Sequence, residues 1–159
     1  NDILPAGNGI EIGVGTGRFA APLRIAYGLD SSKEMLEIAR KRGVKTILGS
    51  AYSTNLKDKS FDYSLFYMTL CFLSDPQRAI KEAYRISTKV ISVILDRECA
   101  YVQGLMSKKS GFYAFANFYT AEDIINFYRD AGLQIVGEVR KRLKTSEGVE
   151  YILTAIIGS

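Results

Sequence analysis

The sequence predicts an α/β fold: a doubly wound, mostly parallel seven-stranded sheet with a C-terminal antiparallel hairpin and helices on both faces. Three observations predict it. Short apolar segments alternate with amphipathic helical segments along most of the chain, which is typical of a parallel sheet. A glycine-rich turn, "GVGTG", follows the first strand-like segment. Two strand-like segments near the end are separated only by "KTSEG", as in a hairpin.

The first half of the chain alternates between strand and helix signals. Strands are expected at 9–13, 24–30 and 44–48, and helices at 18–23 and 31–43. For the second helix, Ser31 and Glu34 form a capping-box pattern. One face of that helix is expected to be apolar through Met35, Leu36, Ile38 and Ala39.

The second half continues the alternation and then changes to a hairpin. Strands are expected at 61–68 and 89–96, and helices at 75–87 and 120–132. Asp75 and Thr120 stand at N-cap positions, and Pro76 suits the first helical position. The last two strands are expected at 134–143 and 149–157. With 159 residues, 47% of them hydrophobic, the chain fits a single domain, 1–159.

Ligands of such sheets bind outside the carboxyl ends of the strands, where the strand order reverses. The turns after the first four strands are therefore the expected site. The turn "GVGTG" lets a ligand approach the backbone and opens a helix whose first amides are free. Asp30 ends the second strand, and a carboxylate there can accept both hydroxyls of a ribose. The glycine spacing differs from the dinucleotide fingerprint G-x-G-x-x-G.

Composition limits the chemistry and the setting. The chain has no histidine, so the commonest general base and metal ligand is missing, and we expect no metal. Two cysteines favour a reducing, cytoplasmic compartment over a disulfide scaffold. No apolar run reaches the roughly 18 residues of a membrane span. The net charge of +4 predicts ordinary solvated surface, and a nucleic-acid partner is not favoured. The abrupt start, "NDILPAGN", leads us to expect a preceding segment that this sequence lacks.

At four places the chain resembles class I S-adenosylmethionine-dependent methyltransferases of the small-molecule type. "EIGVGTGRFA" is similar to their first motif and "GLDSSKEMLEIAR" to the second. "GSAYSTNLKDKSFDYSLFYMTLCFLSDP" resembles the third and fourth, and "FYTAEDIINFYRDAGLQIVGEV" the later helix and strand. The resemblance implies S-adenosylmethionine as cofactor, S-adenosylhomocysteine as product and a small-molecule methyl acceptor.

The resemblance also implies roles for single residues. The glycines would lie against the methionine part and the ribose, Glu11 would orient the ammonium group, and Asp30 would hold the ribose hydroxyls. The implied cofactor-binding set is Glu11, Gly13, Gly15, Gly17, Asp30, Ser31, Met35, Ser50, Ala51, Tyr52, Tyr67 and Met68. Ser50 departs from the family pattern, which has an acid there. The segment from Gly17 to Asp30 is shorter than is usual in the family. The family often has a Gly-Gly turn before the fifth strand, and this chain lacks it.

The segment 97–119 is expected to form a lid-like insertion over the acceptor. It is long for a connection and rich in aromatic residues, which suit an apolar or cationic acceptor, although they equally fit a small core beneath a loop. "TLCFLSDP" is a second candidate wall. No catalytic residue is identified, because methyl transfer by in-line displacement depends chiefly on proximity. Candidates for the acceptor pocket are Tyr67, Thr69, Cys71, Tyr101 and Tyr113.

Two other functions stay open at this point. One is a methyltransferase acting on RNA or protein, which a continuous basic face beside the cofactor mouth would favour. The other is a different nucleotide- or cofactor-binding domain of the same fold, either non-catalytic or a nicotinamide dehydrogenase. The sequence gives no indication of the oligomeric state or of the acceptor atom.

Overall fold

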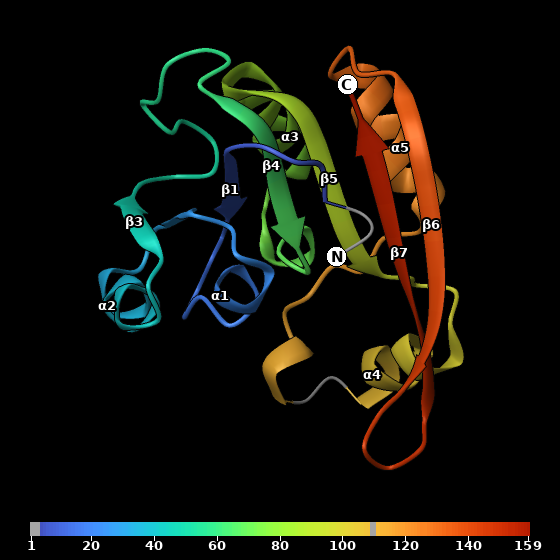
Figure 1. Ribbon diagram of the computed structural model, residues 1–159. Coiled ribbons are helices and arrows are strands. Elements are labelled where there is room, and N and C mark those ends of the chain that lie inside the picture. The colour runs from blue at the N-terminus through green and yellow to red at the C-terminus, as the bar shows by residue number, and fades with distance from the viewer. Residues whose placement is uncertain (1–3, 109–110) are drawn as a thin grey trace.

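A computed structural model describes residues 4–108 and 111–159 and contains one seven-stranded sheet (Figure 1). The strand order is β3-β2-β1-β4-β5-β7-β6. β7 runs antiparallel to both neighbours, and the other adjacent pairs are parallel. The predicted fold class is therefore confirmed. The strands are β1 (Gly9–Ile12), β2 (Tyr27–Asp30), β3 (Lys45–Leu48), β4 (Phe61–Tyr67), β5 (Ser87–Leu95), β6 (Ile135–Lys144) and β7 (Glu150–Gly158).

The helices occur in the connections between these strands, and two of them begin at the predicted caps. Asp75 accepts a hydrogen bond from the amide of Arg78, and Thr120 forms a capping box with Asp123. The helices are α1 (Ala20–Leu23), α2 (Lys33–Lys41), α3 (Pro76–Ile86), α4 (Ala100–Lys108) and α5 (Ala121–Asp130), with short 3₁₀ helices η1 (Leu70–Phe72) and η2 (Gly111–Tyr113).

Two details of α2 differ from the sequence prediction. Ser32, not Ser31, is the N-cap, because its side chain accepts the hydrogen bond from the amide of Met35. Met35 and Ile38 are 44% and 42% exposed, so the predicted apolar face is narrower than expected. The short helix needs to bury only one row of side chains against the sheet.

The segment 97–119 carries α4 and η2, which the sequence patterns did not predict. The hydrophobic pattern of α4 lacks a clear apolar stripe, and its buried residue is Val102. Val102 packs with Leu95, Cys99 and Phe118 in a small cluster beside the end of β5. Residues 109–110 of this segment, and residues 1–3, lie outside the described part of the chain.

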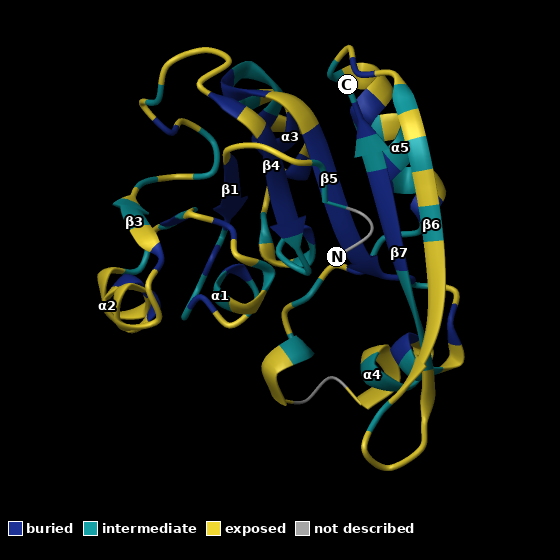
Figure 2. Cartoon of the chain, viewed as in Figure 1, coloured by how far each residue is buried: buried dark blue, intermediate teal, exposed yellow. Residues whose placement is uncertain are grey.

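Helices cover the two faces of the sheet unequally. On one face α3 and α5 pack on the strands through a core that includes Phe66, Ile80 and Ile124. On the other face a second cluster joins Leu36 and Ala39 of α2 to the sheet. Figure 2 shows buried residues concentrated in β4 and β5, whereas β6 at the sheet edge is mostly exposed.

A buried hydrogen bond joins α5 to β5. The hydroxyl of Tyr128 lies 2.8 Å from Ser92 Oγ, and both residues are fully buried. Removing one partner of such a bond leaves a buried polar group unsatisfied.

We predict that Tyr128→Phe lowers the free energy of unfolding by about 1–2 kcal/mol, because the Ser92 hydroxyl loses its partner. Urea unfolding of both proteins measures the difference. Tyr84→Phe is the control, since among the described residues the Tyr84 hydroxyl has no hydrogen-bond partner. Equal stability of wild type and Tyr128→Phe would contradict the prediction.

Candidate active site

A cavity of about 890 Å³ opens at the carboxyl ends of β1, β2, β3 and β4. This is the edge of the sheet where the sequence predicts a ligand. The predicted cofactor residues, Gly17 apart, line the cavity. They are Glu11, Gly13, Gly15, Asp30, Ser31, Met35, Ser50, Ala51, Tyr52, Tyr67 and Met68.

The glycine turn is held against β2 and against the exit of β4. The amides of Gly13 and Val14 both donate to the Leu29 carbonyl, at 2.8 and 3.0 Å. At Gly13, with φ of +73°, an added Cβ would lie 2.2 Å from Thr69 Cγ2, so a side chain there would collide with the floor. At Gly15 an added Cβ would meet nothing within 4 Å. That position is open for a ligand to approach the backbone.

Gly17 has a different environment from the other two glycines. An added Cβ there would lie 3.1 Å from the backbone and side chain of Ala39 in α2. Its φ of +72° is also in the left-handed region. Gly17 therefore allows the turn to pack closely on α2, and it does not border the cavity.

The Asp30 carboxylate joins the glycine turn to the start of α2. Its Oδ2 accepts the Gly15 amide at 2.8 Å and its Oδ1 accepts the Ser32 amide at 2.9 Å. These two bonds fix the orientation of the carboxylate. Because each carboxylate oxygen has a second lone pair, both oxygens can still accept hydrogen bonds from a molecule in the cavity.

Glu11 is a buried carboxyl group at the base of the cavity. Only 1% of the residue is exposed, and Oε2 has no hydrogen-bond partner among the described residues. Burial raises the pKa of Glu11 to about 8, and the negative charge of Asp30 adds to this rise. A hydrogen bond from the backbone of Ala20 opposes the rise in pKa. The group is poised to pair with a cation or a hydrogen-bond donor.

The floor of the cavity is formed where the chain leaves β4. Met68 has a φ of +55°, an unusual conformation for a residue with a side chain, which costs about 1–3 kcal/mol. Its amide donates to the Val93 carbonyl at 2.8 Å. Thr69 Oγ1 donates to the Tyr67 carbonyl at 3.2 Å. The reversal of the chain at Met68 brings Tyr67, Met68 and Thr69 together on the floor.

The loop after β3 provides another side of the cavity. The Ser50 hydroxyl accepts the Tyr52 amide at 3.2 Å, which uses one of its lone pairs. The Tyr52 hydroxyl lies 3.0 Å from Ser74 Oγ and accepts the Ser74 amide at 3.0 Å. These contacts tie the loop after β3 to the loop after η1.

The candidate acceptor residues separate into two groups. Tyr67, Thr69 and Tyr113 line the cavity. Cys71 instead borders a much smaller cavity beside Met68, and burial raises the pKa of its thiol to about 12. Tyr101 is absent from the lining and packs on Tyr151, with ring centroids 5.7 Å apart.

Several lining residues were not predicted as site residues. Phe72, Leu73 and Phe112 lie in the two segments that the sequence marked as candidate walls. Phe19 stacks on Tyr67 with ring centroids 4.0 Å apart. Its position two residues after the last glycine of the turn is the signal that could have identified it. Further lining residues are Val14, Thr16, Arg18, Leu29 and Gly49.

A second cavity of about 220 Å³ lies on the face of the sheet beside α1. Its lining is apolar apart from Lys141 and the hydroxyl of Tyr67. Tyr67 also lines the larger cavity.

Within residues 4–108 and 111–159, no three His, Cys, Asp or Glu side chains group as metal ligands do. No helix of the described chain has the length and apolar character needed to cross a membrane.

We predict that the ligand-free protein loses stability as pH rises from 5 to 8. In that range Glu11 is protonated when folded and ionised when unfolded, so the folded state binds more protons. The group contributes a slope of about 1.4 kcal/mol per pH unit. Glu11→Gln should remove this slope. Urea unfolding at several pH values measures it, with the exposed Glu147→Gln as control. Parallel pH profiles for wild type and Glu11→Gln would contradict the raised pKa.

Comparison with known proteins identifies the family. Residues 10–89 match the family model described as a methyltransferase domain. An uncharacterized protein of Methanocaldococcus jannaschii is 38% identical over 94% of this chain and 75% of its own length. A demethylmenaquinone methyltransferase of Thermotoga maritima is 27% identical, over 79% of this chain and 69% of its own.

A solved structure from Thermotoga maritima agrees with these matches. It is described as a SAM-dependent methyltransferase and possible histamine N-methyltransferase. The two sequences are 39% identical. The match covers 99% of this chain and 84% of the Thermotoga chain, and the two structures superpose with a TM-score of 0.90. The chain therefore belongs to the methyltransferase-domain family and has the fold of class I S-adenosylmethionine-dependent methyltransferases.

Proposed function

We propose that the cavity at the carboxyl edge binds S-adenosylmethionine in a defined orientation and that the chain transfers the methyl group to a small-molecule acceptor. One observation carries the proposal. A single cavity joins a glycine turn after β1, a fixed carboxylate at the end of β2, and the residues that leave β3 and β4. A nucleoside with a charged tail needs these groups along one continuous path.

Asp30 is proposed to hold the ribose. The amides of Gly15 and Ser32 already occupy one lone pair on each carboxylate oxygen, and the remaining pairs suit two neighbouring hydroxyl groups. Gly15 leaves room for the ligand beside the turn, because nothing occupies the space in front of its Cα. Ser50, Ala51 and Tyr52 are then the candidates for contacts with the adenine.

Glu11 is proposed to bind the ammonium group of the cofactor. Its Oε2 has no hydrogen-bond partner among the described residues, and a buried carboxyl oxygen without a partner is costly. A bound cation would favour the ionised carboxylate and satisfy the free oxygen. The fit of a cationic tail to this buried acid supports S-adenosylmethionine over a neutral nucleoside.

The cofactor supplies an activated methyl group on a sulfonium, so the protein mainly has to position the acceptor. Tyr67, Met68 and Thr69 form the floor between the two ends of the cavity. Their backbone is fixed by the hydrogen bond from Met68 to β5. An acceptor held in line about 3–3.5 Å from the methyl carbon can react without a strong base. This mechanism is compatible with a chain that has no histidine.

A small-molecule acceptor is favoured over RNA or protein. The basic run from Arg140 to Lys144 lies on β6, at the opposite edge of the sheet from β3. Of the basic residues in that run, only Lys141 lines a cavity that the described residues form, and that cavity is the smaller one. The possible histamine N-methyltransferase and the demethylmenaquinone methyltransferase both carry names of enzymes with small acceptors, which supports the same class here.

We predict that Asp30→Asn weakens S-adenosylhomocysteine binding by about 1.5–3 kcal/mol, roughly 10- to 150-fold, because a charge-assisted hydrogen-bond acceptor is lost. Asparagine keeps one acceptor oxygen for the surrounding amides, which limits damage to the turn. Isothermal titration calorimetry measures the affinity, and Glu37→Gln on the exposed face of α2 is the control. Unchanged affinity in folded Asp30→Asn would overturn the proposed ribose contact.

A further inference from the structure

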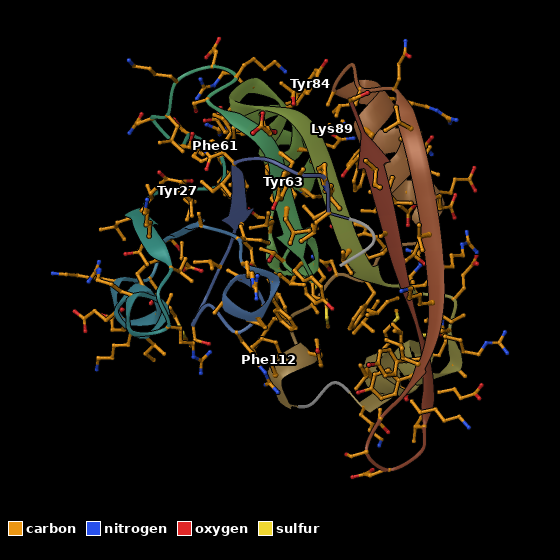
Figure 3. All side chains as sticks on the ribbon, viewed as in Figure 1. Tyr27, Phe61, Tyr63, Tyr84, Lys89 and Phe112 are labelled. Atoms are coloured by element: carbon orange, nitrogen blue, oxygen red, sulfur yellow. The ribbon has the colours of Figure 1, made fainter. Side chains whose placement is uncertain are left out.

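The end of the cavity away from Asp30 is walled by aromatic side chains. Phe72 of η1 contributes to it, together with Phe112 and Tyr113 of η2. The Phe72 ring centroid lies 4.9 Å from that of Phe112 and 6.1 Å from that of Tyr113. Figure 3 shows Phe112 below α1, on the short helix that follows α4. We call Phe72, Phe112 and Tyr113 the aromatic wall.

The wall has free ring surface. Phe112 is 77% exposed although it borders the cavity, and Phe72 is 38% exposed. Phe115, four residues from Gly111, is 90% exposed and does not line the cavity. A flat ring placed against Phe72 and Phe112 would bury apolar surface and gain the stacking energy of aromatic pairs.

The cavity extends from the ends of β2 and β3 to the aromatic wall. Its volume of about 890 Å³ lies near the upper end of the range of about 300–1,000 Å³ for sites that hold one drug-sized ligand. The polar groups assigned to the cofactor, Asp30, Ser31 and Ser50, lie at the ends of β2 and β3. The aromatic wall follows β4 and α4, so Tyr67, Met68 and Thr69 lie between the two regions.

Among the described residues that line the aromatic end, none is suited to remove a proton. Burial raises the pKa of the Tyr67 and Tyr113 hydroxyls, so both stay protonated near neutral pH. The Cys71 thiol borders the neighbouring small cavity. The proposed function assigns Glu11 and Asp30 to the cofactor, and Arg18 is a cation. An alcohol or phenol acceptor would need a base to take its proton, whereas a neutral nitrogen base has a lone pair available.

We propose that the aromatic wall binds the methyl acceptor and that this acceptor is a planar nitrogen base, an aromatic amine or a nitrogen heterocycle. The inference rests on the proposed function, because it places the acceptor next to a bound S-adenosyl group. Phe72 and Phe112 contact the flat ring of the acceptor. Tyr113 borders the same space.

The transfer balances without a protein base. The nitrogen lone pair forms the new N–C bond, the C–S bond breaks, and its electron pair goes to sulfur, which becomes a neutral thioether. The nitrogen gains the positive charge and, where it carries hydrogen, releases a proton to water afterwards. Burial of an amine between apolar rings disfavours its protonated form through desolvation, which favours the reactive neutral form.

The test measures acceptor binding to the protein saturated with S-adenosylhomocysteine, where no transfer occurs. Aniline, imidazole and benzimidazole are the planar probes, and cyclohexylamine is the saturated counterpart. Calorimetry on wild type should show tighter binding of planar probes. Phe112→Ala should weaken that binding about tenfold, whereas Phe115→Ala, on an exposed ring of the same segment, should leave it unchanged. Both variants should keep the wild-type affinity for S-adenosylhomocysteine.

The outcomes separate the two proposals. If S-adenosylhomocysteine binds but no planar probe does, the acceptor class is wrong and the proposed function stands. Equal losses in Phe112→Ala and Phe115→Ala would overturn the role of the wall. In a transfer assay with S-adenosylmethionine, methylation of phenol as fast as aniline would overturn the nitrogen assignment. Failure of S-adenosylhomocysteine to bind would overturn the proposed function and this inference with it.

Discussion

The two hydrogen bonds that the Asp30 carboxylate accepts fix the positions of two segments that border the cavity. One oxygen accepts the amide of Gly15 and the other accepts the amide of Ser32. The turn after β1 and the helix after β2 are therefore fixed to the same side chain. A carboxylate fixed in this way needs no rearrangement before it meets two hydroxyl groups, and this preorganisation limits the entropy lost on binding. This contact acts together with the hydrogen bonds from the Gly13 and Val14 amides to the Leu29 carbonyl to set the position of the glycine turn.

A second constraint joins the same turn to β4. Gly13 passes so close to Thr69 that a side chain would collide with it, and Met68 reverses the chain with an unusual positive φ. The floor and the turn are therefore set by backbone geometry, held by the sheet. The aromatic wall is built differently, from two short 3₁₀ helices that contact each other through rings. The residues proposed to bind the cofactor are therefore held by the sheet, whereas those proposed to bind the acceptor lie on short helices outside it.

Sequence patterns predict the sheet well because strand and helix periodicity and capping are local signals. Asp30, Gly13 and Gly15 could be placed at the cavity because the carboxyl ends of parallel strands meet at one edge. Other features needed the three-dimensional structure. The exposure of Met35 and the cap at Ser32 depend on how α2 is oriented against the sheet, which the local sequence pattern does not specify. Phe112 reaches the cavity through long-range packing of the segment after α4, which no spacing in the sequence reports.

The most direct test of the central claim is thermal unfolding with S-adenosylhomocysteine, S-adenosylmethionine and nicotinamide dinucleotides titrated separately. A ligand at 100 times its dissociation constant stabilises the folded state by about 2.7 kcal/mol, a shift of a few degrees in Tm. We expect a dose-dependent rise in Tm with the two adenosyl ligands and none with the dinucleotides. A rise with the dinucleotides alone would contradict the assignment of the carboxyl-edge cavity to S-adenosylmethionine.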